Sequence, residues 1–146
     1  MDKTVKRYEI KKVGRAFESG FKIKSSKDGY KYALKFYHED MEIYESVFIM
    51  LLNNSNEVIG YAKISQGGIT GTVVDVRIIA KFCVESLATA FIMCHNHPSG
   101  KLMPSNADDS ITKKVKDGLA LLDIKLLDHL ILTSRGYYSY ADESKI

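Results

Sequence analysis

The sequence predicts an α/β domain in which helices flank a mixed β-sheet. Residues 76–88 and 107–122 repeat their apolar side chains with the 3.6-residue period of an amphipathic helix. Residues 47–52 and 126–132 are continuous apolar runs, which are typical of strands buried on both faces of a sheet. The chain has 146 residues, of which 45% are hydrophobic, so it is long enough for one domain with a substantial core.

Upstream of the first apolar run, the sequence predicts one helix. Residues 9–13 have the pattern of a short edge strand. Ser25 and Ser26 are both suitable N-caps for a helix over 27–37, in which large apolar and aromatic side chains recur at helical spacing. The acidic residues 39–45 then connect this helix to the sheet.

A β-hairpin is predicted next, beginning with the buried strand at 47–52. Residues 53–56 supply the turn, and residues 58–64 form the returning strand. A loop follows, marked by Gly67, Gly68 and Gly71. It lacks both the Gly-x-Gly-x-x-Gly spacing and a following Lys-Ser/Thr, so it does not have the pattern of a phosphate-binding loop.

Helices and strands alternate in the rest of the chain. The helix over 76–88 has apolar positions at Val76, Ile79, Ala80, Cys83, Val84 and Leu87. After a short buried strand at 91–94, the helix over 107–122 has one apolar face, made by Ile111, Val115, Leu119 and Leu122. Strands at 126–132 and 137–140 form a second hairpin. The order predicts a hairpin at each end and a helical crossover in the middle.

Charge is distributed unevenly along the chain. Residues 1–35 hold 11 Lys/Arg against 4 Asp/Glu, whereas residues 36–146 hold 10 against 14. The basic stretch 1–35 is interpreted either as a solvated lysine-rich segment or as a surface for nucleic acid or another acidic partner. We therefore expect a basic N-terminal segment with one helix at 1–38 and a core domain at 39–146.

The sequence shows neither a secretory signal nor a transmembrane segment. Its first residues lack an apolar stretch followed by a cleavage site, and its longest apolar run, 47–52, is far shorter than the ~20 residues that span a bilayer. Cys83 and Cys94 fit a reducing compartment better than a disulfide. A cytoplasmic protein with no membrane partner is the expectation.

Two histidines, His95 and His97, follow the predicted strand at 91–94. In extended backbone, residues i and i+2 point to the same side with Cα atoms about 6.5–7 Å apart, so both imidazoles can reach one metal ion. Asp108, near the start of the next helix, can supply a third ligand. Two imidazoles and one carboxylate leave a fourth position for water, which is the arrangement of catalytic zinc sites.

The same residues also have a structural interpretation. Ser105 and Asp108 have the spacing of a capping box, with Ser105 as the N-cap and Asp108 bonding back to it. An aspartate in a first helical turn is also favoured by the helix dipole. His129 likewise has two interpretations, a group that supports a zinc ligand and a histidine satisfied within the core, of which the second is favoured.

Three other metal-binding motifs do not match. An HNH nuclease spreads its three residues over a ββα unit, whereas the letters HNH are contiguous at 95–97. A zinc deaminase needs His-x-Glu followed by Pro-Cys-x-x-Cys, and a zinc finger needs cysteine pairs. Cys94 is next to His95 along the strand, so we expect its side chain to point into the core.

Residues 95–108 read HNHPSGKLMPSNAD, which resembles the JAMM motif of the JAB/MPN metallopeptidases, H-x-H-x7-S-x2-D with a proline in the spacer. Three further strings resemble the RadC-like branch of that superfamily: Pro98-Ser99-Gly100, Leu127-Asp128-His129 and Gly136-Tyr137-Tyr138-Ser139. The resemblance covers roughly residues 42–146. It implies a mixed sheet with flanking helices, related in architecture to the cytidine-deaminase fold.

The resemblance also implies roles for individual residues. His95, His97 and Asp108 would bind Zn²⁺, and Ser105 would hydrogen-bond the attacking water or the tetrahedral intermediate. The family further needs a glutamate general base just before a buried strand. Glu45 fits that place, although the sequence alone does not choose it over Glu39, Asp40 and Glu42. The implied function is zinc-dependent cleavage of a peptide or isopeptide bond in an unidentified protein or peptide.

Two departures from the RadC-like pattern leave rival functions open. Longer RadC-like proteins carry an N-terminal helix-hairpin-helix domain that suggests DNA contact, where this chain has the basic stretch 1–35. Many also have His-Pro-Arg-Glu before the helix that precedes the motif, where this chain has Asp75-Val76-Arg77-Ile78. The alternatives are a DNA-associated accessory module with a structural or vestigial zinc site, and a metal-dependent nuclease that uses the same ligands.

Overall fold

A computed structural model describes residues 20–67 and 73–146 of the chain. In chain order its elements are α1 (Ser26–Ala33), the 3₁₀ helices η1 (Leu34–Phe36) and η2 (Glu39–Glu42), β1 (Ser46–Leu52), β2 (Val58–Gln66), α2 (Val76–Ser86), β3 (Ala90–Asn96), α3 (Asn106–Ala120), β4 (Lys125–Thr133) and β5 (Gly136–Ser139). The strands form one sheet in the order β2-β1-β3-β4-β5, with β3 and β4 parallel and the other neighbours antiparallel. This confirms the predicted α/β fold.

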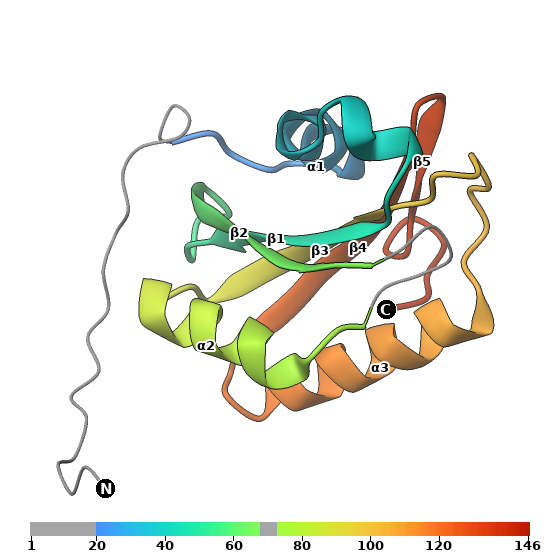
Figure 1. Cartoon of the computed structure of the whole chain (residues 1–146). Helices are drawn as coiled ribbons and strands as arrows, with labels where there is room; N and C mark the ends of the chain where they lie inside the picture. The colour runs from blue at the N-terminus through green and yellow to red at the C-terminus, as the bar shows by residue number, and fades with distance from the viewer. Residues whose placement is uncertain (1–19, 68–72) are drawn as a thin grey trace, which may run out of the picture.

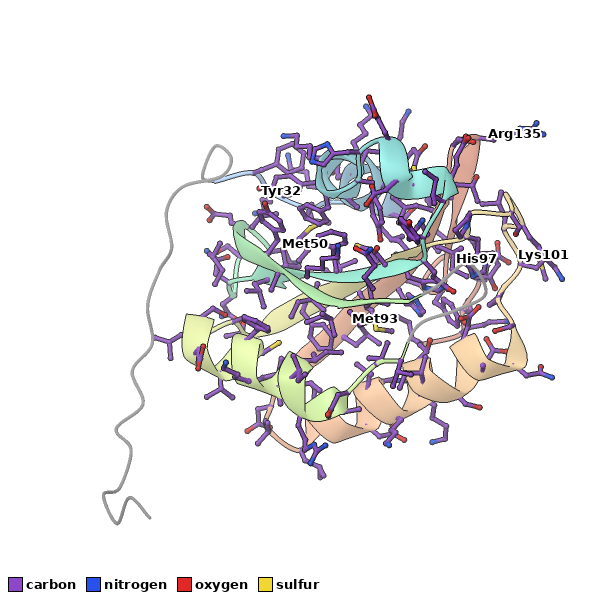
Figure 2. All side chains as sticks on the ribbon, viewed as in Figure 1. Tyr32, Met50, Met93, His97, Lys101 and Arg135 are labelled. Atoms are coloured by element: carbon purple, nitrogen blue, oxygen red, sulfur yellow. The ribbon has the colours of Figure 1, made fainter. Side chains whose placement is uncertain are left out.

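The sheet is covered on both faces, by α1 on one side and by α2 and α3 on the other (Figure 1). Successive side chains of a strand point to opposite faces, so β1, buried along its whole length, contributes to two separate cores. Met50 packs with Tyr32 on the α1 side, whereas Ile49 and Met93 pack against α2 and α3 (Figure 2). Burial on both sides explains why β1 and β3 are continuous apolar runs rather than alternating ones.

The chain connections follow the predicted order. The β1–β2 hairpin turns at Asn53, whose side-chain oxygen accepts hydrogen bonds from the backbone N–H groups of Ser55 and Glu57. The parallel strands β3 and β4 are joined by α3, as parallel pairing requires a crossover. A second hairpin joins β4 to β5. As a result, the C-terminal end of β3 and the N-terminal end of α3 lie at the same edge of the sheet (Figure 1).

The ends of three predicted helices are corrected by the structure. The first helix is α-helical only to Ala33 and continues as the 3₁₀ helix η1, because Tyr37 turns to extended backbone and its hydroxyl donates a hydrogen bond to the Ser46 carbonyl. The second helix ends before Leu87, which adopts left-handed backbone (φ 60°) and is 82% exposed instead of lying on the apolar face. The third ends at Ala120, which leaves Leu122 exposed beyond it.

Several other expectations are confirmed or adjusted. Ser25 is the N-cap of α1, where its hydroxyl accepts a hydrogen bond from the Asp28 N–H. Strand β3 extends two residues further than predicted, through His95 and Asn96. Cys94 points into the α1 core as expected. Part of the acidic connector is the 3₁₀ helix η2.

Some predictions fall outside the described residues. These are the edge strand at 9–13, most of the basic stretch 1–35, and Gly68 and Gly71 of the glycine loop. Within residues 20–67 and 73–146, no helix is both long enough and apolar enough to cross a bilayer.

Candidate metal centre

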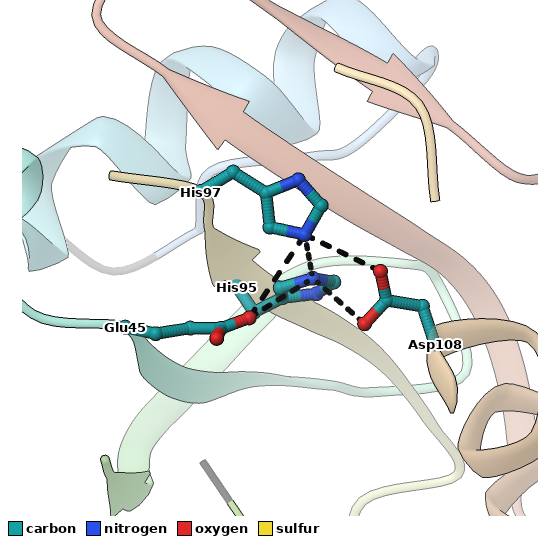
Figure 3. A group of neighbouring side chains, drawn as sticks. All are labelled: Glu45, His95, His97 and Asp108. Atoms are coloured by element: carbon teal, nitrogen blue, oxygen red, sulfur yellow. Dashed lines mark hydrogen bonds and ion pairs between the residues drawn. The ribbon is translucent and has the colours of Figure 1, made fainter. Parts of the chain in front are cut away.

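Four side chains from three parts of the fold meet at the end of the sheet where β3 terminates (Figure 3). Glu45 lies just before β1, His95 lies near the end of β3, His97 follows β3, and Asp108 lies in the first turn of α3. Each offers a ligand atom, and these atoms all lie within 4.8 Å of one another. Among the described residues, these four side chains form a group that could hold a metal ion.

Strand register explains why Glu45 joins the histidines. The antiparallel pairing of β1 with β3 places Val47 opposite His95. If the same register is continued by two residues on each chain segment, Glu45 lies opposite His97. The three acidic residues that compete with Glu45 in the sequence, Glu39, Asp40 and Glu42, lie in η2 and are not part of the cluster.

Helix capping places Asp108 in the same cluster. The Ser105 hydroxyl accepts a hydrogen bond from the Asp108 N–H at 3.0 Å, and the Ser105 N–H donates to Asp108 Oδ2 at 2.8 Å. This is the capping box predicted from the sequence. The same carboxylate also contacts both histidines, so the structural interpretation and the metal-ligand interpretation hold together rather than exclude each other.

The distances within the cluster fit a tetrahedral metal ion. Four ligands with bonds of about 2.0–2.1 Å would lie about 3.3 Å from one another. His95 Nε2 and His97 Nε2 are 2.9 Å apart, and the Asp108 oxygens lie 3.4 Å from His95 Nε2 and 3.3 Å from His97 Nε2. Glu45 Oε1 is further away, at 3.6 Å from His95 Nε2 and 3.9 Å from His97 Nε2. All four side chains could therefore hold one ion, and Glu45 lies furthest from the two imidazoles.

The cluster is largely shielded from solvent, yet it is not closed. The side chain of His95 is 5% exposed, and those of Glu45, His97 and Asp108 are 14–15% exposed. His97 Nδ1 lies 2.6 Å from the Lys101 carbonyl oxygen, which can only accept, so Nδ1 carries the proton. In the neutral ring, Nε2 of His97 then presents its lone pair to the cluster.

Mutual contacts shift the pKa values of two of these groups. Burial raises the pKa of Asp108, but its contacts with His95 and His97, which favour the carboxylate when those rings are protonated, outweigh burial and hold that pKa well below its usual range. Burial lowers the pKa of His97, but in the protonated ring the hydrogen bonds to Asp108 and to the Lys101 carbonyl outweigh it, so the net shift is upward. Asp108 is therefore a carboxylate throughout the neutral range, as a metal ligand must be.

His129 is satisfied within the core, as favoured from the sequence, and it also contacts the cluster through His95. It is buried in β4, and its Nε2 lies 2.6 Å from His95 Nδ1. Its Nδ1 lies 2.6 Å from the hydroxyl of Thr112 in α3. Burial is the main cause that lowers the pKa of His129 well below its usual range, so the ring stays neutral.

Asn96 was not identified from the sequence as a site residue, although it holds the backbone around Glu45 in place. Its side chain is fully buried on the opposite face of β3 from His95. It accepts a hydrogen bond from the Ser46 N–H at 2.8 Å and donates to the carbonyls of Met41 and Tyr44. These three bonds tie the segment on both sides of Glu45 to β3. Thr112 was also missed, since a threonine within a helix carries no motif.

These features define a class of protein: an α/β domain with a mixed sheet and a candidate metal centre of two histidines, an aspartate and a glutamate at the strand ends. The chain belongs to the RadC-like JAB domain family, whose model matches residues 23–145. The match begins earlier than the resemblance read from the sequence and includes α1.

Curated relatives agree with this assignment. The chain is 51% identical over 122 residues to a UPF0758 protein of Flavobacterium johnsoniae, which is 84% of this chain and 52% of the relative. It is 43% identical over 100 residues to a UPF0758 protein of Porphyromonas gingivalis, covering 68% of this chain and 44% of the relative. A UPF0758 protein of Streptococcus gordonii is 36% identical over 102 residues, or 70% of this chain and 45% of the relative. The chain thus spans about half the length of these relatives.

Proposed function

We propose that this protein is a zinc-dependent hydrolase of the JAMM type that cleaves a peptide or isopeptide bond. The observation that carries the proposal is the geometry of the cluster: the donor atoms of His95, His97 and Asp108 lie 2.9–3.4 Å apart, while Glu45 lies just beyond them. Two nitrogen donors and one oxygen donor with a free fourth position are the ligands of a catalytic zinc site. The substrate is a protein or peptide of unknown identity.

Each residue has a distinct role in this proposal. His95, His97 and Asp108 hold the ion, and a bound Zn²⁺ supplies a water of lowered pKa and a Lewis acid for the carbonyl oxygen. Glu45 is the general base: its carboxylate takes a proton from the attacking water and then delivers it to the leaving amine nitrogen. Glu45 Oε1 lies beside the proposed ligands, at 3.6 Å from His95 Nε2 and 3.9 Å from His97 Nε2, which supports its role as acceptor of a proton from a water held at the free fourth position.

Ser105 is proposed to stabilise the oxyanion that forms when the amide carbonyl becomes tetrahedral. In the capping box its oxygen is an acceptor, which leaves the hydroxyl proton available for donation. The rigid helix start therefore holds both a zinc ligand and an oxyanion donor in one turn of α3.

Metal content and turnover of Glu45→Gln test the proposal together. Purified, zinc-loaded wild-type protein should contain about one zinc per chain by elemental analysis and should hydrolyse members of a fluorescence-quenched peptide library that includes lysine isopeptide bonds. Glu45→Gln keeps the three ligands but cannot accept a proton, so it should retain zinc while its turnover falls about 10²–10⁴-fold.

His97→Ala and Asp108→Ala are the matched controls, because each removes a ligand and should lose both the zinc and the activity. Wild-type protein without zinc after loading would contradict the proposed metal site. Zinc-loaded Glu45→Gln protein with unchanged turnover would remove Glu45 from the role of base.

A further inference from the structure

We propose that Thr112 and His129 are positioning residues that hold His95 in the tautomer with its proton on Nδ1, so that its Nε2 lone pair faces the cluster before a metal binds. The inference rests on the proposed function, because a lone pair at this position serves a metal ligand. It concerns two side chains that are not among the four residues of the cluster.

Hydrogen bonds run from the Asp108 carbonyl through Thr112 and His129 to His95, and we call this chain the relay. Because it begins at a backbone carbonyl, the donor and acceptor of each bond can be assigned. The Thr112 hydroxyl lies 2.6 Å from the carbonyl oxygen of Asp108, four residues earlier in α3. A carbonyl can only accept, so the single hydroxyl proton of Thr112 is used there. At its second contact, 2.6 Å from His129 Nδ1, Thr112 Oγ1 is therefore the acceptor, and His129 Nδ1 carries the proton.

The second step passes this assignment to the metal ligand. A neutral imidazole has one protonated nitrogen, so His129 Nε2 is an acceptor. It lies 2.6 Å from His95 Nδ1, which must then donate. His95 Nε2 is left without a proton, and this atom faces His97 Nε2 at 2.9 Å and Asp108 Oδ1 at 3.4 Å.

The side chains of the relay are buried, so its hydrogen bonds are shielded from bulk solvent. As whole residues, Thr112, His129 and His95 are 2%, 1% and 4% exposed, respectively. The His129 ring stacks on Tyr140, with centroids 4.7 Å apart and planes 9° from parallel. The relay also links α3, β4 and β3, so the helix that carries Asp108 is bonded through side chains to the strand that carries His95.

The two histidine ligands are thus set by different means. His97 Nδ1 donates directly to the Lys101 carbonyl in the loop after β3, at the more exposed side of the cluster. His95 faces the interior, where its Nδ1 contacts His129 Nε2, and the relay performs the same task through two side chains. Metal-ligating histidines are generally held through their second nitrogen in this way.

Loss of the relay has a defined chemical consequence. Without an acceptor for its Nδ1 proton, neutral His95 can place the proton on Nε2 and donate it to the Asp108 carboxylate instead. That proton must be displaced before a metal binds. Removal of such outer partners typically lowers metal affinity about 10–100-fold, and we expect a loss in this range.

Thr112→Val and Thr112→Ser form the test pair, since valine keeps the branched shape without the hydroxyl and serine keeps the hydroxyl. In metal-free wild-type protein labelled with ¹⁵N-histidine, NMR should show the His95 proton on Nδ1. Thr112→Val should shift it toward Nε2 and weaken Zn²⁺ binding about 10–100-fold in competition with a chelator. Thr112→Ser should restore both the tautomer and the affinity, and thermal unfolding should verify that each variant is folded.

The outcomes separate this inference from the proposed function. A His95 proton on Nε2 in metal-free wild-type protein would overturn the relay whether or not any hydrolysis is observed, and this measurement needs no variant. Equal zinc affinity and an equal His95 spectrum in wild type and folded Thr112→Val would also overturn it. Failure of the hydrolase assay with an intact tautomer effect and an intact affinity effect would instead count against the proposed reaction alone.

Discussion

Asp108 completes the cap of α3 and is also a proposed metal ligand. Its Oδ2 accepts the backbone hydrogen bond that completes the capping box of α3, and its two oxygens also face His95 and His97. The capping bond fixes the carboxylate relative to the helix, so the side chain reaches the histidines without losing rotational freedom on metal binding. Asp108, which the capping-box spacing places at the start of α3, is thus also part of a cluster assembled from residues distant in the sequence.

Alanine substitutions at Asp108 and Ser105 should separate these two tasks. Each removes part of the capping box and should lower the free energy of unfolding of the metal-free protein by about 1 kcal/mol. Saturating zinc should stabilise wild type by about 2.7 kcal/mol at a free concentration 100 times Kd. Ser105→Ala should keep this zinc-dependent gain, whereas Asp108→Ala should lose it, as measured by thermal unfolding with and without zinc.

Ser105→Ala is the control for the helix cap, because it leaves all three proposed ligands in place. If Asp108→Ala protein were stabilised by zinc as strongly as wild type, Asp108 would be a helix cap without a role in the metal site.

At the scale of elements, the two sides of β3 serve different purposes near its end. His95 points toward the cluster on the α2 and α3 side, and the next residue, Asn96, points to the opposite face. Asn96 holds the backbone on both sides of Glu45 through three hydrogen bonds. The alternation of a single strand thus supplies both a proposed ligand and the anchor that positions the proposed base.

Two exposed leucines at helix ends allow the effect of backbone conformation to be isolated. Leu87 follows α2 with left-handed backbone (φ 60°), whereas Leu121 follows α3 with right-handed backbone (φ −64°). Leu87→Gly should raise the free energy of unfolding by about 0.5–1 kcal/mol, because glycine adopts positive φ without the steric cost that leucine pays. Urea denaturation of the purified variant measures this change.

Leu121→Gly is the matched control, since its side chain is 87% exposed, similar to the 82% of Leu87. It should lower the free energy of unfolding by about 0.5–1 kcal/mol, because here glycine only adds flexibility to the unfolded chain. Destabilisation of equal size by both substitutions would show that the conformation at Leu87 carries no strain.

At the scale of the whole molecule, each of the two cores holds one cysteine. Cys83, on α2, packs in the core between α2, α3 and the sheet, and Cys94, on β3, packs in the core on the α1 side; both are free thiols with no exposed surface. Burial raises the pKa of Cys83 to about 12, and burial together with the charge of Asp128 raises the pKa of Cys94 as well. Both thiols are therefore protonated and unreactive in the native state at mildly alkaline pH.

Thiol labelling should therefore report global unfolding. At pH 8.5 both cysteines should react with a thiol reagent only at the rate at which the protein opens, and at the rate of free thiols in urea. The folded pKa of Cys83 lies above the unfolded value of about 8.5, so its contribution to stability is complete below that pH and is lost as pH rises toward 12. Rapid labelling of native protein would contradict the burial of both side chains.

Much of the fold was predictable because its signals are local. The apolar runs of β1 and β4 and the helical periods of α2 and α3 are confirmed, since burial on two faces or on one helix face leaves a pattern in consecutive residues. The helix ends were less accurate: Leu87 has the apolar character of the helix face, but its backbone leaves the helix. Capping at Ser105 was readable because the donor and acceptor are three residues apart.

The sequence by itself determined the main helices and strands apart from their exact ends, the His-x-His pair at the end of a strand and the aspartate at the helix start, because each depends on spacing within a few residues. Only the tertiary structure singled out Glu45 for the cluster among four acidic neighbours, and only it joined His129 and Thr112 to His95. Those contacts depend on the register between β1 and β3 and on the packing of α3 against β4. Strand register and helix packing are set by the whole core, so no local pattern encodes which distant side chains meet.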